Sequence, residues 1–147
     1  MVRLVRLLCS RRMGAADFRQ NFEAGNIEAV LADFAPDIAV YHAGQPDPSS
    51  SPAFHEVMFP ALRAVLGPEF RFTDLVRAQA HGAEYALLPW STVIDGIDTE
   101  GIDLVREAQD GRLAEIRFVM RPLAAIQAVH RLMKERTGPP PSGDRVG

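Results

Sequence analysis

Apolar residues recur at helical spacing in the first third of the chain. Phe18 and Phe22 predict a short helix that ends at Gly25. Asn26 is a suitable N-cap for a second helix, which Pro36 would end. The apolar stripe of this second helix is Ile27, Val30, Leu31 and Phe34.

Two more helical segments follow. One comes after the polar loop 45–51, and the last runs from Pro122, an acceptable first helical residue, to about Glu135. Pro60 interrupts the third segment, so we expect a kink or a late helix start there. The apolar residues of the third segment are Val57, Met58, Ala61, Leu62 and Val65.

Between residues 70 and 120 the pattern becomes that of strands. Asp95-Gly96 and Asp110-Gly111 are strong signals for two-residue hairpin turns. Turns at these positions would pair Leu88 with Asp103 and Asp103 with Phe118 on one face of the sheet. The same register predicts three further pairs: Trp90 with Gly101, Arg106 with Glu115, and Glu107 with Ala114.

The hairpin at residues 81 and 82 does not determine which alternate residues of the preceding strand face the core. A plain two-residue turn would point Arg71 and Thr73 inward, whereas Phe70, Phe72 and Val76 form the apolar pattern. A β-bulge would reconcile the two patterns, and both alternatives stay open.

Composition indicates one soluble globular domain. Apolar residues make up 47% of the 147 residues and charged residues 24%, with eight Phe to build a core. No stretch approaches the roughly 18 apolar residues that a membrane-spanning helix needs. We expect a disordered extension over residues 1–13, one domain over 14–136, and a disordered Pro- and Gly-rich tail over 137–147.

Charge and cysteine content narrow the function classes. The net charge is −3, and the four arginines among the first twelve residues leave a more acidic body, which argues against nucleic-acid binding. Cys9 is the only cysteine, so no disulfide framework is possible, and we expect a reducing, cytoplasmic location. No His-x-His or His-x-x-x-His pair supports a metal site, and His55, His81 and His130 are expected on the surface or on a helix face.

The order of elements, together with three stretches of sequence, resembles a known family. Residues 22–40 are similar to the opening of the nuclear transport factor two-like, or SnoaL-like, families, and residues 101–106 and 110–116 to their closing hairpin. The resemblance covers about residues 14–125. It implies an α+β fold in which a strongly curved, mixed but mainly antiparallel sheet wraps around the N-terminal helices as a cone with an internal pocket. Members include ketosteroid isomerases, polyketide cyclases, limonene epoxide hydrolases, dehydratases and pockets without chemistry.

Asp103 is the main catalytic candidate. It is a carboxylate on an apolar face beside Trp90 and Phe118, where burial would raise its pKa toward the range that suits proton abstraction. The resemblance also implies a pocket carboxylate on this strand. Alternatively, Asp103 accepts hydrogen bonds from a neighbouring loop and only shapes the sheet.

Tyr41 and His42 end the first strand, where the resemblance places the pocket opening. Neighbouring residues of a strand face opposite ways, and alternation groups His42 with the apolar Ile38 and Val40. His42 could shuttle a proton or orient a carbonyl group, or it could be an edge residue in water. The residues expected to line the pocket are Trp90, Phe118, Met120, Leu88 and Phe59.

Two of the family's activities require residues that this chain has only in part or not at all. Epoxide hydrolysis needs an Arg-x-Asp on a strand, and the body of the chain has none. A ketosteroid isomerase uses a Tyr, a protonated Asp and a second Asp as base, a set that Tyr41, Asp74 and Asp103 supply only in part.

Two functional hypotheses remain. The first is a cofactor-free isomerase, cyclase or lyase that acts by proton transfer on a small apolar carbonyl compound. The second is a non-catalytic domain for small-molecule binding or dimerisation. The outer sheet face also predicts a two-fold homodimer, because it carries a contiguous apolar patch. The patch consists of Leu87, Pro89, Val93, Ile102, Leu104 and Val119.

Overall fold

The computed structural model describes residues 14–138, so the predicted extension 1–13 and nearly all of the predicted tail lie outside the described residues. The helices are α2 (Gly14–Ala24), α3 (Ile27–Ala32), α4 (Pro52–Leu66) and α5 (Leu123–Thr137). The strands are β1 (Phe34–Tyr41), β2 (Arg71–Phe72), β3 (Val76–Ala80), β4 (Ala83–Ile94), β5 (Ile97–Glu107) and β6 (Leu113–Arg121).

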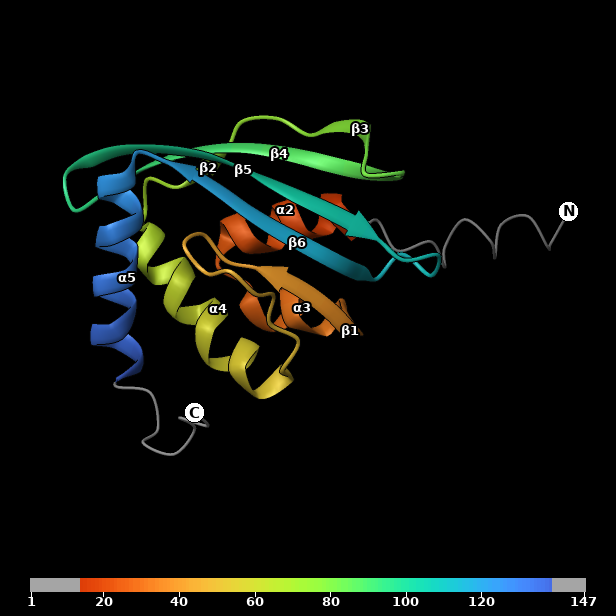
Figure 1. Cartoon of the computed structure of the whole chain (residues 1–147), viewed down its shortest axis with the longest axis horizontal. Coiled ribbons are helices and arrows are strands. Elements are labelled where there is room, and N and C mark those ends of the chain that lie inside the picture. Colours follow the sequence, from red (N-terminus) through yellow and green to blue (C-terminus); the bar gives the residue numbers. More distant parts are fainter. Residues whose placement is uncertain (1–13, 139–147) are drawn as a thin grey trace, which may run out of the picture.

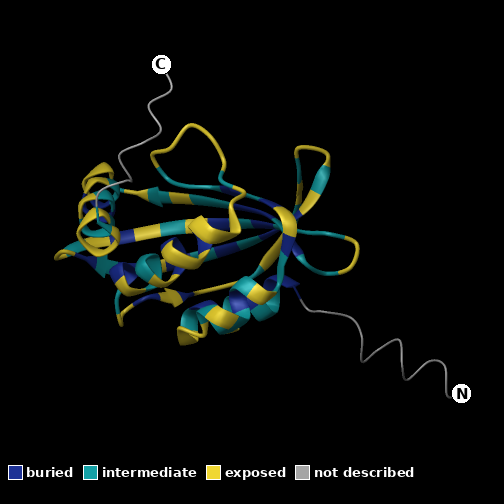
Figure 2. Ribbon diagram, turned by 90° about the horizontal axis from the view of Figure 1, so that it is seen from below, coloured by how far each residue is buried: buried dark blue, intermediate teal, exposed yellow. Residues whose placement is uncertain are grey.

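One curved, open sheet carries the fold. Its strand order is β1-β6-β5-β4-β2, with β3 also paired to β4, and only β1 and β6 run parallel. The long strands arch over α2, α3 and α4, while α5 stands at one end of the sheet (Figure 1). Buried and exposed residues alternate along these strands (Figure 2), so one face meets the helices and the other is the outer face. The predicted α+β class with a curved mixed sheet is confirmed.

The predicted register of the long strands is confirmed over most of its length. Leu88 lies opposite Asp103 and Asp103 opposite Phe118. Asp95 and Gly96 both have positive φ (51° and 74°), as a tight hairpin turn that matches the strand twist requires. The pairing of Glu107 with Ala114 was wrong. A register shift follows Arg106 and puts Glu107 opposite Leu113, since the loop closes through a hydrogen bond from Ala108 N–H to the Arg112 carbonyl.

The structure shows which residues face inward in the strands before the turn at residues 81 and 82. A plain two-residue turn forms, and β3 pairs with β4 through it. The register then differs by one residue between β3 and β2, which turns Phe70 and Phe72 inward. Val76, in contrast, lies on the outer face with 46% of its surface exposed. The shift between the two strands therefore does what a bulge was expected to do.

Three helix predictions need correction. Phe34 belongs to β1 rather than to the second helix, because the neighbouring Asp33 carbonyl accepts a hydrogen bond from Leu113 N–H of β6 and the chain joins the sheet there. Asn26 makes no side-chain hydrogen bond to cap α3. The third helix starts early rather than late, with Ser51 as its N-cap, and it continues through Pro60, which is exposed.

The core is rich in aromatic rings. Phe18 and Phe22 of α2 stack with ring centroids 5.4 Å apart, and Phe22 meets Phe70 edge-on at 5.5 Å. Phe70 in turn contacts Trp90 of β4 at 5.5 Å. These rings bury large apolar areas, so they connect the helix layer to the sheet. No helix among residues 14–138 is long and apolar enough to cross a membrane.

Gly101→Ala tests the close packing of β5 against the Trp90 indole. An added Cβ would lie far inside contact distance of the indole ring and of the Val119 carbonyl oxygen, and that oxygen belongs to the backbone. We expect a loss of about 1–3 kcal/mol or more in the free energy of unfolding, measured in urea. Trp90 is the only tryptophan, so its fluorescence reports on this position. Asp98→Ala, an exposed position of the same strand, should unfold like the wild type; equal stability of both variants would contradict the prediction.

Candidate functional site

Asp103 lies on the inward face of β5 and is almost completely buried, with 1% of its surface exposed. Its neighbours across the sheet are Leu88 and Phe118. The indole N–H of Trp90 donates a hydrogen bond to Asp103 Oδ1 at 2.8 Å. Gly101 makes this bond possible, because any side chain there would collide with the indole ring that reaches across. The carboxyl group is therefore held by one neutral donor in an otherwise apolar setting.

Burial raises the pKa of Asp103 to about 8, although the Trp90 hydrogen bond favours the ionised form and partly offsets this rise. The second oxygen, Oδ2, has no hydrogen-bond partner among residues 14–138. At neutral pH Asp103 is thus a mostly protonated acid with one free oxygen.

A second polar group consists of His42, Ser49 and His55. His42 Nε2 and Ser49 Oγ are 2.9 Å apart, and Ser49 Oγ and His55 Nε2 are also 2.9 Å apart. Two backbone hydrogen bonds between Ser49 and Val40, of 2.8 and 2.9 Å, pin the loop against β1. Ser51 then caps α4, and His55 falls in the first turn of that helix. The loop thereby places one hydroxyl between two imidazoles.

Aromatic rings enclose both imidazoles. His42 lies against Phe54 and Phe118, with centroids 5.8 and 5.9 Å away. His55 lies against Phe34 at 5.7 Å and Phe59 at 5.8 Å. Burial lowers the pKa of His42 to about 4, with smaller contributions from His55 and His130. Burial also lowers the pKa of His55, so both rings are neutral at neutral pH.

Phe118 connects the two groups. It lies opposite Asp103 in the β5–β6 register, and its ring contacts His42. Because β5, β6 and β1 are neighbours and strands are about 4.8 Å apart, the backbones at Asp103 and His42 are separated by roughly 10 Å. A small molecule over the Phe118 ring would have an acid on one side and a neutral imidazole on the other.

The other predicted residues divide between the two faces of the sheet. Tyr41 lies on the outer face, where the Arg117 guanidinium stands 4.0 Å above its ring, so the structure does not bring Tyr41 to Asp103. Asp74 is exposed and accepts a hydrogen bond from Leu75 N–H. Of the predicted pocket residues, Leu88, Phe59 and Trp90 are buried core residues, and Phe118 and Met120 are partly buried against the core.

Sequence reasoning missed Ser49 and His55. His55 was expected on the surface or on a helix face, and it lies on the buried face of α4 with only 2% of its surface exposed. A signal was available, since His55 precedes Met58 and Phe59 by three and four residues and so continues the buried stripe of α4. Val57, which was expected to belong to the apolar side of this segment, is 56% exposed. Ser49 has no comparable signal, because only the backbone pairing with Val40 brings it to His42.

The predicted internal pocket stays a prediction. Three of the hollows on the surface of the described chain, including one of about 630 Å³ between the α2–α3 turn and α4, are lined by neither Asp103 nor His42. Rings of the core occupy much of the space under the sheet. Within residues 14–138, no cluster of three or more His, Cys, Asp and Glu side chains is placed to hold a metal ion.

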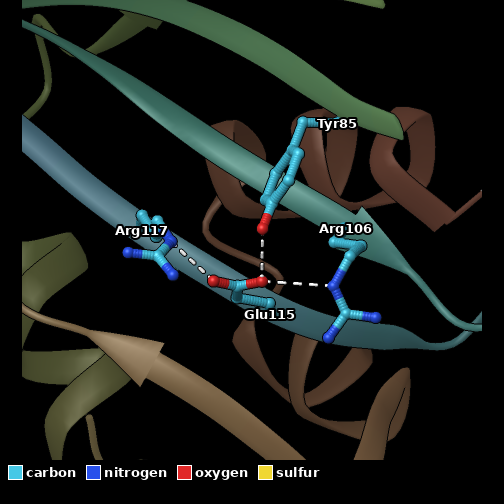
Figure 3. A network of polar contacts seen from close by, with 4 residues as sticks. All are labelled: Tyr85, Arg106, Glu115 and Arg117. Atoms are coloured by element: carbon cyan, nitrogen blue, oxygen red, sulfur yellow. Dashed lines mark hydrogen bonds and ion pairs between the residues drawn. The ribbon is translucent and has the colours of Figure 1, made fainter. Parts of the chain in front are cut away.

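The outer face carries a different buried carboxylate, Glu115 of β6 (Figure 3). Tyr85 donates a hydrogen bond to it at 2.7 Å, and Arg106 and Arg117 donate through their Nε atoms. The predicted pair of Arg106 and Glu115 is confirmed, at 3.1 Å. Burial by itself would raise the pKa of Glu115, but the hydrogen bonds from Tyr85 and the two arginines lower it overall. Glu115 is therefore ionised, unlike Asp103.

Comparison with solved structures identifies the fold. A steroid delta-isomerase from Pseudomonas aeruginosa superimposes with a TM-score of 0.74 at 20% identity, over 84% of this chain and 88% of that one. A bacterial protein with a cystatin-like fold from Silicibacter pomeroyi DSS-3 gives 0.74 at 17% identity, over 86% of each chain. A candidate polyketide cyclase from Xanthomonas campestris pv. campestris gives 0.58 at 15% identity, over 78% of this chain and 93% of that one.

The chain thus has the cystatin-like, NTF2-like fold, and the resemblance read from the sequence is confirmed at that level. At these identities the likeness concerns the fold alone. No protein-family model matches the chain, and no curated protein matches it in sequence.

The raised pKa of Asp103 predicts a pH-dependent stability. The folded chain keeps this carboxyl protonated up to about pH 8, whereas the unfolded chain ionises it near pH 4. Between these values the folded state holds one more proton, so its free energy of unfolding falls as pH rises, by about 1 kcal/mol per pH unit. Asp103→Asn removes this fall in the free energy of unfolding, because an amide does not ionise, and its oxygen still accepts the hydrogen bond from the Trp90 indole N–H. Urea unfolding between about pH 5 and 7 should show the variant gaining on the wild type with rising pH.

The other titratable groups are the same in both proteins, so their contributions cancel in the difference between variant and wild type. Asp98→Asn, an exposed aspartate of the same strand, is the matched control and should follow the wild type. A constant difference between Asp103→Asn and the wild type across this range would mean that Asp103 is ionised throughout.

Proposed function

We propose that this protein binds a small apolar carbonyl compound and catalyses proton transfer on it without a cofactor, as an isomerase, cyclase or lyase. The observation that carries the proposal is Asp103, a buried carboxyl group whose pKa is raised to about 8 and whose Oδ2 is free. An acid that stays neutral at neutral pH can donate a hydrogen bond to a carbonyl oxygen as that oxygen gains negative charge. We further propose that it acts in the cytoplasm.

In the proposed mechanism, neutral Asp103 donates a hydrogen bond and neutral His42 accepts a proton. The raised pKa of Asp103 makes it a hydrogen-bond donor through Oδ2, rather than the base that the sequence first suggested. His42 has a lowered pKa and a free Nδ1, because only its Nε2 has a partner among the described residues. Its bare nitrogen would take a proton from the carbon next to the carbonyl and return it to another position. Environments that push two pKa values apart are typical of such acid–base pairs.

One observation favours the alternative, a non-catalytic binding domain. Core rings fill much of the space under the sheet, and none of those three surface hollows reaches Asp103. A ligand would have to displace the partly buried ring of Phe118 or the exposed ring of Phe54. Binding without turnover of any ring ketone, with ligand-induced shifts at Phe118, would favour this second function.

Substitution of Asp103 tests catalysis. Asp103→Leu removes the hydrogen-bond donor, and turnover should fall by roughly 10²–10³. Asp103→Asn should keep part of the rate, because an amide still donates a hydrogen bond but cannot transfer a proton. The measurement is deuterium incorporation into cyclic ketones and enones, followed by NMR. Asp98→Asn is the control and should exchange at the wild-type rate. Wild-type exchange by Asp103→Leu would end the catalytic proposal.

We also propose that the outer sheet face joins two copies of the chain. Ile102 and Val119 are 40% and 54% exposed and pair across β5 and β6. Val76 of β3 is 46% exposed and pairs with the half-buried Leu87 of β4. Leu104 lies between Leu87 and Arg117 in the same register. A two-fold partner would cover this patch with the same patch of its own surface. Glu115 and its two arginine partners would then lie at the edge of the interface.

Leu104→Glu tests the dimer. It would place a carboxylate from each subunit at the centre of the patch, so the dimer should dissociate while the inward face stays intact. Sedimentation at micromolar concentration should give the wild type twice the 16.2 kDa chain mass and the variant a single mass. Val57→Glu, an exposed apolar position on α4, is the control and should remain dimeric. A wild-type mass near 16.2 kDa would contradict the proposal.

A further inference from the structure

A single hydroxyl proton governs the group of His42, Ser49 and His55. Ser49 Oγ lies 2.9 Å from Nε2 of each histidine, so both contacts are hydrogen bonds. A hydroxyl donates one proton and accepts with its lone pairs. Ser49 can therefore donate to only one of the two rings, so at least one Nε2 carries a proton and donates to Ser49 Oγ. Where the Ser49 hydroxyl donates to the second ring, the Nε2 of that ring is bare.

This geometry restricts the tautomers of both histidines. A neutral imidazole has one N–H and one bare nitrogen. The ring that donates to Ser49 through Nε2 has a bare Nδ1, and the ring that accepts has its proton on Nδ1. Both rings are neutral near pH 7, since burial lowers their pKa values. When the Ser49 hydroxyl donates to one of the two rings, His42 and His55 are opposite tautomers, and reversing the hydroxyl reverses both.

We propose that Ser49 and His55 act as positioning residues that keep Nε2–H on His42 and leave its Nδ1 bare, so that His42 is the proton acceptor opposite Asp103. In this arrangement Nε2–H of His42 donates to Ser49 Oγ, and the Ser49 hydroxyl donates to Nε2 of His55. His55 then carries its proton on Nδ1. The assignment of His42 as acceptor rests on the proposed function, whereas the coupling of the two tautomers does not.

The same chain forms a relay for the transferred proton. When a C–H bond of the substrate breaks, its proton binds Nδ1 of His42 and the electron pair stays on the substrate as an enolate, which the Asp103 hydroxyl stabilises. The Nε2 proton of His42 can then pass to Ser49 Oγ, and the Ser49 proton to Nε2 of His55. His42 becomes neutral again and His55 carries the charge. The reverse transfers return a proton to the substrate at a second carbon.

The surroundings hold the three side chains in place. The paired backbones of Ser49 and Val40 fix the hydroxyl, and the ring contacts of both histidines limit their rotation. His130 is the third imidazole near this loop, and its Nε2 lies 2.9 Å from the Ala43 carbonyl oxygen. Because a carbonyl oxygen only accepts, His130 must carry its proton on Nε2. It is an internal reference for that tautomer.

The test is ¹⁵N NMR of the histidine rings at neutral pH, where protonated and bare ring nitrogens have well-separated chemical shifts. The chain has four histidines, so each can be assigned by substitution. We expect His55 as the Nδ1–H tautomer, and His42 and His130 as Nε2–H tautomers. A His42 ring with its proton on Nδ1, or two Nε2–H tautomers at positions 42 and 55, would overturn the proposal.

Ser49→Ala provides the second arm. Without the hydroxyl, His55 should lose its Nδ1–H signal and shift to the Nε2–H tautomer that imidazole prefers in water. Ser49→Thr keeps a hydroxyl at this position and should restore the wild-type spectrum. Ser50→Ala removes an exposed neighbouring hydroxyl and should leave the spectrum unchanged. Persistence of the Nδ1–H signal of His55 in a folded Ser49→Ala variant would show that another group sets this tautomer.

These outcomes are independent of the catalytic test. The tautomers are read without any substrate, so a failed relay leaves the Asp103 experiment standing. If Asp103→Leu exchanges protons at the wild-type rate while the tautomers are as expected, the catalytic function fails and the coupled histidines remain.

Discussion

The register of β4 against β5 is the constraint on which the interior depends. Asp95 and Gly96 both adopt positive φ in the turn between these strands, and every pair from Ile94–Ile97 to Ala86–Val105 keeps the register that this turn sets. A slip of one residue would exchange the two faces of β5, so Asp103 would leave the interior and Leu104 would enter it. The fit of the Trp90 indole against Gly101 penalises such a slip further.

Two carboxylates of the same sheet show how surroundings decide charge. Asp103 and Glu115 are both buried, and burial favours the neutral form of each. Glu115 has two arginines and a tyrosine hydroxyl, which more than compensate, whereas Asp103 has one indole N–H. The outer face therefore holds an ionised, fully bonded network that suits a structural role. The inner face holds a neutral acid with a free oxygen, which suits proton transfer.

Under the proposed function, the interior must serve both stability and ligand binding. Phe22, Phe59 and Phe70 are completely buried and join the helices to the sheet, so they can hardly give way to a ligand. The side chains around His42 are less constrained, because Phe118 is partly buried and Phe54 is 48% exposed. The phenylalanine core is thus the rigid part of the interior. The surroundings of His42 are the part in which small side-chain movements would admit a small molecule.

The sequence alone determined the fold class, most of the register and the inward position of Asp103, because turn chemistry and two-residue alternation are local properties. It failed where a long-range contact outweighs a local pattern. Phe34 continues a helical stripe but joins β1, since the neighbouring Asp33 carbonyl bonds to β6. Ser49 and His55 are six residues apart in a polar segment, and only the pairing of Ser49 with Val40 and the packing of α4 bring them to His42. Tertiary structure decided these contacts because hydrogen bonds between distant segments depend on where the whole sheet places them.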